Sequence, residues 1–380
     1  MSGNEVVIVK HDMVTSYGWG VDACWRGLLS GDSAISGVKR FCVSQFQADK
    51  AATISDIAAS NHDSLVMQMI RPLFDKGTNE VIKDAMLILA TTTGEIDLLE
   101  RYVFTGEPKK NSSAPERLLA KIRDLTGTSD PGFIVSAACA SSTIAIAQAA
   151  AMISSGECNS VLVVACDSVS EFVFAGFSTI MALAKNIARP FDKNRDGLTL
   201  GEAAGYVLLM SAEAAAKKNM PALAKVSGWG MSNDANHMTG PIRDGSGLAY
   251  AINKALWRGN IAPEDIGSIS AHGTGTIYND AMEMRAFKSV FAGTGFIPIY
   301  SVKGGTGHTM GAAGLVETCI ATKSLYEKII PNTVNLHVPD QEAEGWVLEK
   351  SSRMERAAVL STNSGFGGIN AAIVLRDNNE

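Results

Sequence analysis

The chain has 380 residues, of which 46% are hydrophobic and 19% charged, with 36 glycines and a formal net charge of −6. This composition is typical of a compact α/β protein and excludes a disordered or fibrous chain. The acidic balance argues against a nucleic-acid-binding protein, which would carry a basic surface. The length allows two ordinary domains or one large fused one, with a core that needs neither disulfides nor metal.

The six cysteines show neither a CxxC pair nor zinc-finger spacing. The opening stretch MSGNEVVIVKHDM has an apolar run too short for a secretory signal and lacks a cleavage pattern. No stretch reaches the roughly 18 apolar residues that predict a membrane span. We therefore expect reduced thiols, a cytoplasmic location and no membrane span.

Strand-like apolar runs alternate along the chain with helical patterns. In the first half the runs are Val6 to Val9, Met86 to Ala90, Phe133 to Val135, Ser160 to Ala165 and Gly205 to Met210. In the second half they are Ala224 to Trp229, Ile266 to Ala271, Pro298 to Ser301, Ala357 to Thr362 and Ala371 to Leu375. Helical patterns cover Ser142 to Ser155, Gly247 to Arg258, Asp280 to Phe291 and Ala312 to Glu327. This alternation predicts β-α-β units and largely parallel sheets.

The strand pattern restarts after the charged, proline-containing segment 211–223. We therefore expect two similar halves, 1–215 and 216–380, although identity between them is too faint to prove duplication. Residues 40–80 have weak periodicity, and we expect a helical insertion over one face there.

Residues 135–148, VSAACASSTIAIAQ, place Cys139 between a strand ending at Val135 and a helical pattern over Thr143 to Met152. Backbone N–H groups and the helix dipole at such a position favour a thiolate and can hold an oxyanion. This position would suit a nucleophilic Cys139 with a lowered pKa. From this stretch alone, however, a buried structural cysteine is the favoured interpretation, because most free cysteines are simply packed in the core.

Two glycine-rich stretches contain histidines. In SAHGTGTIYND (270–280), glycines let the backbone approach a ligand, while Thr274 and Thr276 offer uncharged hydroxyls beside His272. Such a loop suits an amide-bearing arm such as pantetheine, although a loop histidine satisfied by local hydrogen bonds is equally possible.

In SVKGGTGHTMGAAG (301–314), Lys303 precedes the glycines and His308 follows them, so the Walker A pattern fails. A dinucleotide fingerprint is absent as well, which disfavours an oxidoreductase.

A third glycine-rich stretch, STNSGFGGINAAIVL (361–375), is by itself typical of a hairpin turn.

Cys139, His272, and Lys303 together with His308 follow separate predicted strands. Strand ends in α/β sheets gather at one edge, so these four residues can converge. A thiol with two imidazoles suits acyl transfer through a thioester. Zinc is the rival for these ligands, but the residues lie far apart in sequence and a structural site needs four. We expect no metal.

Nearly the whole chain resembles the β-ketoacyl synthases, the condensing enzymes of fatty-acid and polyketide synthesis. The resemblance rests on YGWGVDACWRGLLSGDSAI, ACASS, RPFDKNRDGLTLGEAAG, HGTGT with Glu283 downstream, KGGTGHTMGAAG and NSGFGG. The order Cys, His, Lys, His resembles the elongating, acyl-carrier-protein-dependent type. Initiating synthases pair Cys with His and Asn, and thiolases end with a second reactive Cys. The resemblance implies a thiolase-like α/β fold whose two similar halves give a five-layered αβαβα architecture.

The resemblance also implies a role for each matching residue. Cys139 takes the acyl chain as a thioester, and its backbone N–H forms an oxyanion hole with that of Phe366. His272 and His308 promote decarboxylation of malonyl and stabilise the enolate. Lys303 orients the second histidine, with Glu283 in its network, while Thr274 and Thr276 grip the pantetheine arm.

Two positions depart from the family pattern. Ser364, a candidate substrate-binding residue, stands where relatives have a gating Phe, and Met181 stands where many have a carrier-docking Arg, for which Lys185 or Arg189 are candidate replacements. The chain is also shorter than typical members, with the loss in the first third. These departures favour a specialised pathway, such as aryl-polyene or other type II polyketide synthesis.

The expected enzyme is an acyltransferase without a permanently bound cofactor, whose substrates arrive on the phosphopantetheine arm of acyl carrier protein. A homodimer is expected, or a heterodimer with a related subunit. A non-catalytic, chain-length-factor-like subunit and a thiolase acting on coenzyme A esters are the alternatives. The presence of Cys139 disfavours the first, while His308 and the lack of a late catalytic Cys disfavour the second.

Overall fold

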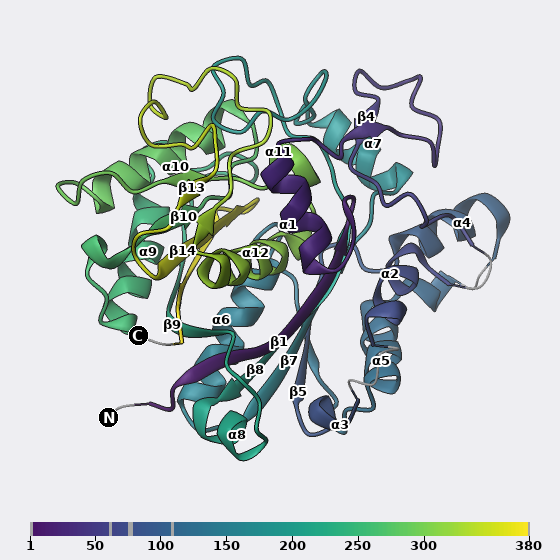
Figure 1. Cartoon of the computed structure of the whole chain (residues 1–380). Helices are drawn as coiled ribbons and strands as arrows, with labels where there is room; N and C mark the ends of the chain where they lie inside the picture. The colour runs from purple at the N-terminus through teal and green to yellow at the C-terminus, as the bar shows by residue number, and fades with distance from the viewer. Residues whose placement is uncertain (1–2, 61–62, 75–78, 108–109, 379–380) are drawn as a thin grey trace.

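The structure is a computed structural model that describes residues 3–60, 63–74, 79–107 and 110–378 (Figure 1). Its main feature is an 11-stranded sheet in the order β11-β10-β14-β15-β9-β1-β8-β7-β5-β6, with β2 paired to β1. The strands of the first half are β1 (Val6–Thr15), β2 (Gly18–Trp19), β5 (Met86–Ala90), β6 (Phe133–Val135), β7 (Ser160–Asp167) and β8 (Ala203–Ser211). Those of the second half are β9 (Ala224–Asn233), β10 (Ser268–Ser270), β11 (Ile299–Tyr300), β14 (Ala358–Gly365) and β15 (Ile369–Arg376).

The two halves of this sheet repeat one strand order. Leaving β2 aside, the first half reads β6-β5-β7-β8-β1 and the second β11-β10-β14-β15-β9, so that both follow the order third, second, fourth, fifth and first along the chain. The halves join where β1 pairs with β9, Val7 opposite Lys225 and Ile8 opposite Ala224. This repetition supports two similar halves. The boundary between 1–215 and 216–380 stays a prediction.

The expectation of largely parallel sheets is wrong, because the sheet is mixed. Strand β5 is parallel to β6 and β7, and β10 is parallel to β11 and β14. The pairs β1–β8, β7–β8, β14–β15 and β9–β15 are antiparallel. The β14–β15 connection is a tight glycine turn, which permits only antiparallel pairing, and alternation of strands and helices in the sequence cannot reveal such pairs.

The helices form three layers around the two half-sheets. The central pair, α6 (Ser141–Ser154) and α12 (Ala313–Glu327), packs against strands of both halves. Most residues of both helices are buried, on nearly every side, which confirms the buried helix expected over 143–152. The outer layer of the first half contains α2 (Leu65–Phe74), α5 (Pro115–Thr126) and α8 (Ala212–Lys217); that of the second contains α9 (Ser246–Gly259) and α10 (Ile277–Val290). The result is an αβαβα arrangement.

The remaining elements lie at the periphery or near the site. They are α1 (Val21–Ser30), α3 (Asn79–Ile82), α4 (Ile96–Thr105), α7 (Glu171–Thr179), α11 (Lys303–Thr306), and the small pairs β3 (Ser36–Gly37) with β4 (Lys50–Ala51) and β12 (Ile329–Ile330) with β13 (Ser352–Arg353). Within 40–80, the helical insertion is confirmed over 65–74, where α2 covers the first half-sheet. Residues 40–64 are mainly loop where described, and 75–78 lie outside the described residues. Among the helices that the structure describes, none is long and apolar enough to cross a membrane.

Candidate active site

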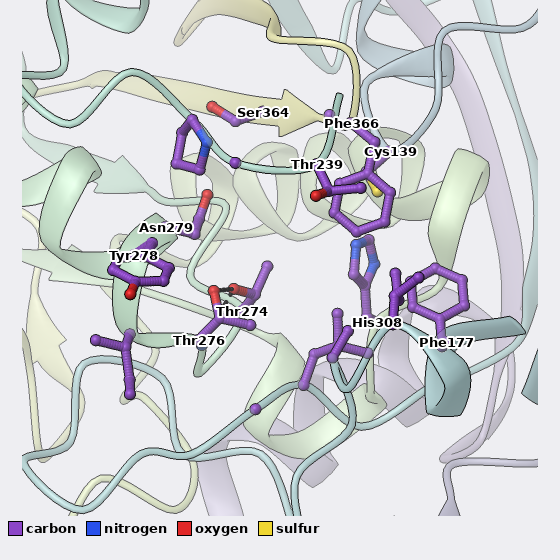
Figure 2. A pocket seen from close by; sticks show the side chains of 18 of the residues that line it. Cys139, Phe177, Thr239, Thr274, Thr276, Tyr278, Asn279, His308, Ser364 and Phe366 are labelled. Carbon is purple, nitrogen blue, oxygen red and sulfur yellow. Dashed lines mark hydrogen bonds between the residues drawn. The ribbon is translucent and has the colours of Figure 1, made fainter. Parts of the chain in front are cut away.

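A cavity of about 400 Å³ is lined by residues of both halves (Figure 2). Four loops that follow strands or precede helices supply its inner wall, because the carboxyl ends of parallel strands share one edge of a sheet. Cys139 lies between β6 and α6, His272 follows β10, His308 follows α11, and Phe366 lies in the β14–β15 turn. The predicted site residues of the two halves therefore reach one chamber.

The three predicted reactive side chains lie together. Sγ of Cys139 and one ring nitrogen each of His272 and His308 are within 4.8 Å of one another, and all three residues are buried. The imidazole rings of His272 and His308 meet edge to face, with centroids 5.1 Å apart. A small molecule in the cavity can therefore contact all three groups at once.

His308 has one ring nitrogen occupied by the backbone. The N–H of Met310 donates to Nδ1 of His308 at 3.1 Å, so a neutral ring carries its proton on Nε2. Burial, with Lys303 nearby, holds the pKa of His308 well below its usual range. At neutral pH this side chain is therefore an uncharged donor.

His272 is held in the same way by a side chain. Nδ2 of Asn363 lies 3.0 Å from Nδ1 of His272, and Oδ1 of Asn363 accepts a hydrogen bond from the Thr143 hydroxyl. This assigns the amide as the donor, leaving the ring proton on Nε2 of His272. Burial, then Lys303 and His308, hold the pKa of His272 well below its usual range.

These hydrogen bonds also bear on the zinc alternative. A metal-bound histidine normally donates its other ring N–H to an acceptor. In both histidines here Nδ1 accepts instead, so Nε2 carries a proton and has no lone pair for a metal. The donor pattern therefore fits hydrogen bonding to a substrate oxygen better than metal ligation.

The expected lowering of the Cys139 pKa is wrong. Burial raises the pKa of this thiol to about 11, against the smaller opposing effects of Lys303 and the Phe366 backbone N–H. The helix begins only at Ser141, and the cavity walls enclose the sulfur. The thiolate therefore loses more stabilisation from water than it gains from the helix dipole and Lys303. The resting thiol is protonated at neutral pH.

The glycine turn after β14 closes over Cys139. The Phe366 backbone N–H lies near Sγ of Cys139 and acts to lower the pKa of this thiol. A Cβ at Gly365 would lie 3.2 Å from the backbone N of Cys139, so a side chain there would crowd this approach. The Phe366 ring stacks on Phe177 with centroids 5.9 Å apart. The amide expected to complete an oxyanion hole thus lies beside the sulfur.

Ser364 lines the cavity, as expected for a substrate-binding residue, but its hydroxyl donates to Oδ1 of Asn370 at 2.8 Å. The aromatic side chain beside Cys139 comes from Phe366 (Figure 2). The absence of Phe at position 364 therefore does not leave this end of the cavity without an aromatic ring.

The network predicted around Lys303 needs correction. Lys303 is fully enclosed; its Nζ donates to the carbonyl of His272 at 2.5 Å and forms an ion pair with Glu317. It therefore fixes the backbone of the first histidine, whereas we expected it to orient His308. Its carboxylate partner is Glu317, which sequence reasoning missed, although a single Glu in the apolar stretch GLVETCIA was a signal for it.

Glu283, expected as the partner of Lys303, holds the HGTGT loop. Its carboxylate accepts from the backbone N–H groups of His272 and Gly273, both at 2.7 Å. Asp280 likewise accepts from the N–H of Thr274 at 3.0 Å. The loop carrying His272 is thus fixed by two carboxylates of α10, the helix that follows it.

The hydroxyls of Thr274 and Thr276 lie 2.9 Å apart on the cavity wall (Figure 2). At the rim, Met181 is 88% exposed and Ile180 is half-exposed. Lys185 is exposed and Arg189 is partly buried, but neither lines the cavity. The placement of both threonines agrees with the expected contact to an entering arm.

A second buried carboxylate was missed. Asp167, at the end of β7, accepts hydrogen bonds from the hydroxyls of Thr91, Thr92 and Thr93, and from the N–H of Gly311 at 2.7 Å. Gly311 follows His308 by three residues, so Asp167 ties the second histidine loop to the first half. The run TTTGE after a strand was its only sequence signal.

Comparison with known proteins points to one family. Residues 100–215 match the β-ketoacyl synthase N-terminal domain and residues 223–337 the C-terminal domain. The chain is 30% identical to 3-oxoacyl-[acyl-carrier-protein] synthase 2 of Vibrio cholerae, over 99% of this chain and 100% of that protein.

Two solved structures share the fold. The ishigamide ketosynthase/chain length factor superposes with a TM-score of 0.88 at 28% identity, covering 98% of this chain and 99% of that one. The ketosynthase in complex with its chain length factor from Xenorhabdus doucetiae gives 0.80 at 26% identity, covering 98% of each. These matches confirm the five-layered thiolase-like architecture. The two domain matches and the 30% identity over 99% of the chain show that this protein belongs to the β-ketoacyl synthase family.

Proposed function

We propose that this protein is an elongating β-ketoacyl-ACP synthase, an acyltransferase that lengthens a carrier-bound acyl chain in fatty-acid or polyketide synthesis. The observation that carries the proposal is the meeting of Sγ of Cys139 with ring nitrogens of His272 and His308 inside a buried cavity. Two neutral imidazoles beside one thiol suit decarboxylative condensation, which needs hydrogen-bond donors for an enolate and requires no strong base.

In the first step the sulfur of Cys139 attacks the carbonyl of an incoming acyl thioester. The oxyanion of the tetrahedral intermediate is held by the backbone N–H groups of Cys139 and Phe366. The pantetheine thiolate leaves and takes up the proton that Cys139 gives up. The acyl group is then bound to Sγ as a thioester, and the free arm departs.

In the second step a malonyl thioester occupies the arm site beside Thr274 and Thr276. The bond from the malonyl methylene to the carboxylate breaks, carbon dioxide leaves, and the electron pair forms an enolate whose oxygen receives hydrogen bonds from Nε2 of His272 and His308. The enolate carbon attacks the acyl carbonyl, and the bond to Sγ of Cys139 breaks. The products are a β-ketoacyl thioester and the Cys139 thiolate, which takes up one proton from water to return to the thiol.

The deciding experiment is intact-mass measurement after incubation with an acyl carrier thioester. The wild type should gain one acyl group on Cys139, and Cys139→Ala should gain none. The Cys139→Ala variant should still release carbon dioxide from a malonyl thioester, because the histidines that hold the enolate remain. Acylation of another cysteine, such as the exposed Cys42, would overturn the assignment.

We propose that the protein works as a dimer, either with itself or with a related subunit. Two of the similar structures are ketosynthases with a chain length factor, which favours the heterodimer for this chain. Native mass spectrometry of the purified chain tests this: a homodimer with condensing activity would contradict the need for a second subunit.

The pathway and location complete the proposal. The similarity to polyketide ketosynthases supports a type II polyketide or aryl-polyene role, which predicts activity with an unsaturated or unusual acyl chain. Equal efficiency with ordinary saturated chains would count against this role.

We infer that no cofactor is permanently bound, since the substrate arm supplies its own thioester. All six cysteines are free, which supports the cytoplasm as location.

A further inference from the structure

An arginine lies over a tyrosine that lines the cavity. The guanidinium carbon of Arg243 is 5.2 Å from the centroid of the Tyr278 ring. Tyr278 lines the cavity and is 60% exposed. In Figure 2 Tyr278 lies well apart from Cys139, with Thr274 and Thr276 between them. The tyrosine therefore marks the end of the cavity that is remote from the sulfur.

The charge of Arg243 is not neutralised by a neighbouring carboxylate. Among the described residues, no Asp or Glu forms an ion pair with it, whereas nearby Arg285 pairs with Glu342 and Arg195 pairs with Asp340. The Arg285 side chain donates to the backbone carbonyl of Arg243 at 2.8 Å. The backbone of Arg243 is thus anchored while its side chain is exposed and available to an anion.

We propose that Arg243, stacked on Tyr278, binds the phosphodiester of the phosphopantetheine arm. This inference rests on the proposed function. The arm's fixed negative charge lies at its phosphodiester end, while the amides along it suit the hydroxyls of Thr274 and Thr276. With Cys139 and the histidines at the thioester end, the phosphodiester falls toward the opposite end of the cavity.

The chemistry of the guanidinium fits this role. Its planar set of N–H donors matches the oxygens of a phosphate and remains charged at any physiological pH. The cation–π contact with the Tyr278 ring holds the guanidinium at this end of the cavity, and no described side chain forms an ion pair with it. Because the chain carries a net charge of −6, an anionic arm needs such a local positive group to enter.

The test compares substrates with and without the phosphate. We would measure kcat/KM for decarboxylation of malonyl-pantetheine, which lacks it, malonyl-phosphopantetheine, malonyl-coenzyme A and the malonyl carrier protein. The variants are Arg243→Ala and Tyr278→Leu, with Arg258→Ala as a matched control. Arg258 also stacks on an aromatic ring, with its guanidinium carbon 4.8 Å from the centroid of Trp229, and neither residue lines the cavity.

We expect Arg243→Ala to lower kcat/KM about tenfold for the phosphate-bearing substrates and much less for malonyl-pantetheine. A factor of about ten is what the loss of hydrogen bonds to a charged group costs. Tyr278→Leu should reduce the same preference in part, and Arg258→Ala should not change it. A loss confined to malonyl-coenzyme A would place Arg243 against the nucleotide phosphates, which the carrier-borne arm lacks, and would overturn the assignment to the arm.

An unchanged preference in Arg243→Ala, or equal losses on all four substrates, would overturn the phosphate assignment while leaving the proposed function intact. A wild-type protein that decarboxylates none of the four would instead contradict the proposed function. The two failures are therefore distinguishable.

Discussion

Nδ2 of Asn363 lies 3.0 Å from Nδ1 of His272, and both residues belong to the second half of the molecule. The same Asn363 accepts a hydrogen bond from Thr143, in the helix that follows Cys139, so the amide connects His272 to the first half of the molecule. Each polar atom of the amide thus has a partner, which fixes both its orientation and the position of the His272 proton.

Replacement of Asn363 by Asp should impair decarboxylation. A carboxylate would accept a hydrogen bond from Nδ1–H of His272, which leaves Nε2 of the neutral ring without a proton to donate to the substrate and raises the histidine pKa. We expect a loss of roughly 100-fold in kcat, the size seen when one oriented donor is removed. The ¹⁵N chemical shifts of His272 should show the changed tautomer. Asn219→Asp, in the exposed turn after α8, is the charge-matched control; an unchanged tautomer in Asn363→Asp would contradict this role.

The thiol of Cys139 should titrate late. Because burial raises its pKa to about 11, the thiolate fraction grows about tenfold per pH unit across the neutral range. The rate of alkylation by iodoacetamide, followed by mass spectrometry of the peptide containing Cys139, should therefore rise from pH 7 to 10 without levelling off. Exposed Cys42, whose pKa is lowered by hydrogen bonds from Ser44, provides the internal comparison. A plateau for Cys139 below pH 8 would contradict this prediction.

Breaking the buried ion pair between Lys303 and Glu317 should be costly. Lys303→Met leaves an unpaired carboxylate and a His272 carbonyl without its donor, and we expect about 3–5 kcal/mol of lost stability. The double variant Lys303→Met with Glu317→Leu should recover part of this loss. Urea unfolding measures both, and equal losses in the two variants would argue against a coupled pair.

The pH dependence of Lys303→Met has a definite sign. Burial raises the pKa of Glu317 to about 7, and the lysine lowers it, so removing the lysine raises it further. A carboxyl whose folded pKa exceeds its unfolded pKa loses stability as pH rises from the unfolded value, near 4.5, toward the folded one. Lys303→Met should therefore be less stable at pH 8 than at pH 5.5, and Glu317→Gln in the same background should remove most of that difference.

Gly314 permits the two central helices to approach. A Cβ there would lie 2.7 Å from the backbone N of Thr143, so Gly314→Ala must separate α6 from α12. We expect about 1–3 kcal/mol of destabilisation, together with lower activity, because Thr143 also positions Asn363. Gly176→Ala, on an exposed face of α7 with open space around it, should instead be neutral or slightly stabilising in thermal denaturation. Equal effects of the two substitutions would show that helix propensity, and not the contact, matters.

Sequence reasoning located the chemistry because reactive residues carry local signals. Cys139, His272 and His308 each lie on a glycine-rich or small-residue loop after a strand, and their convergence followed from parallel strand ends sharing an edge. The resemblance supplied Phe366 and the two threonines. Strand positions were predicted well for the same reason, since an apolar run such as 160–165 is visible without any tertiary knowledge.

The parts that sequence reasoning missed are those decided by tertiary contacts. The pKa of Cys139 depends on how thoroughly the folded walls exclude water, which the helix start alone does not reveal. The partner of Lys303 depends on which of two carboxylates, Glu283 or Glu317, the fold brings near, and no spacing rule separates them. The antiparallel strand pairs, such as β1 with β8, likewise depend on which strands the fold places side by side, and the order of strands and helices along the chain does not reveal this.

The repeated strand order has a final consequence. Cys139 comes after β6, and Lys303 after β11, the third strand of each half, so equivalent corners of two matching frameworks hold different chemistry. One corner supplies the sulfur of Cys139 and the other a buried cation that does not line the cavity. Because both halves have the same strand order, mutation can change the site residues of one half while the other keeps the common architecture. A chain cut between the halves would leave each fragment with only part of the catalytic site.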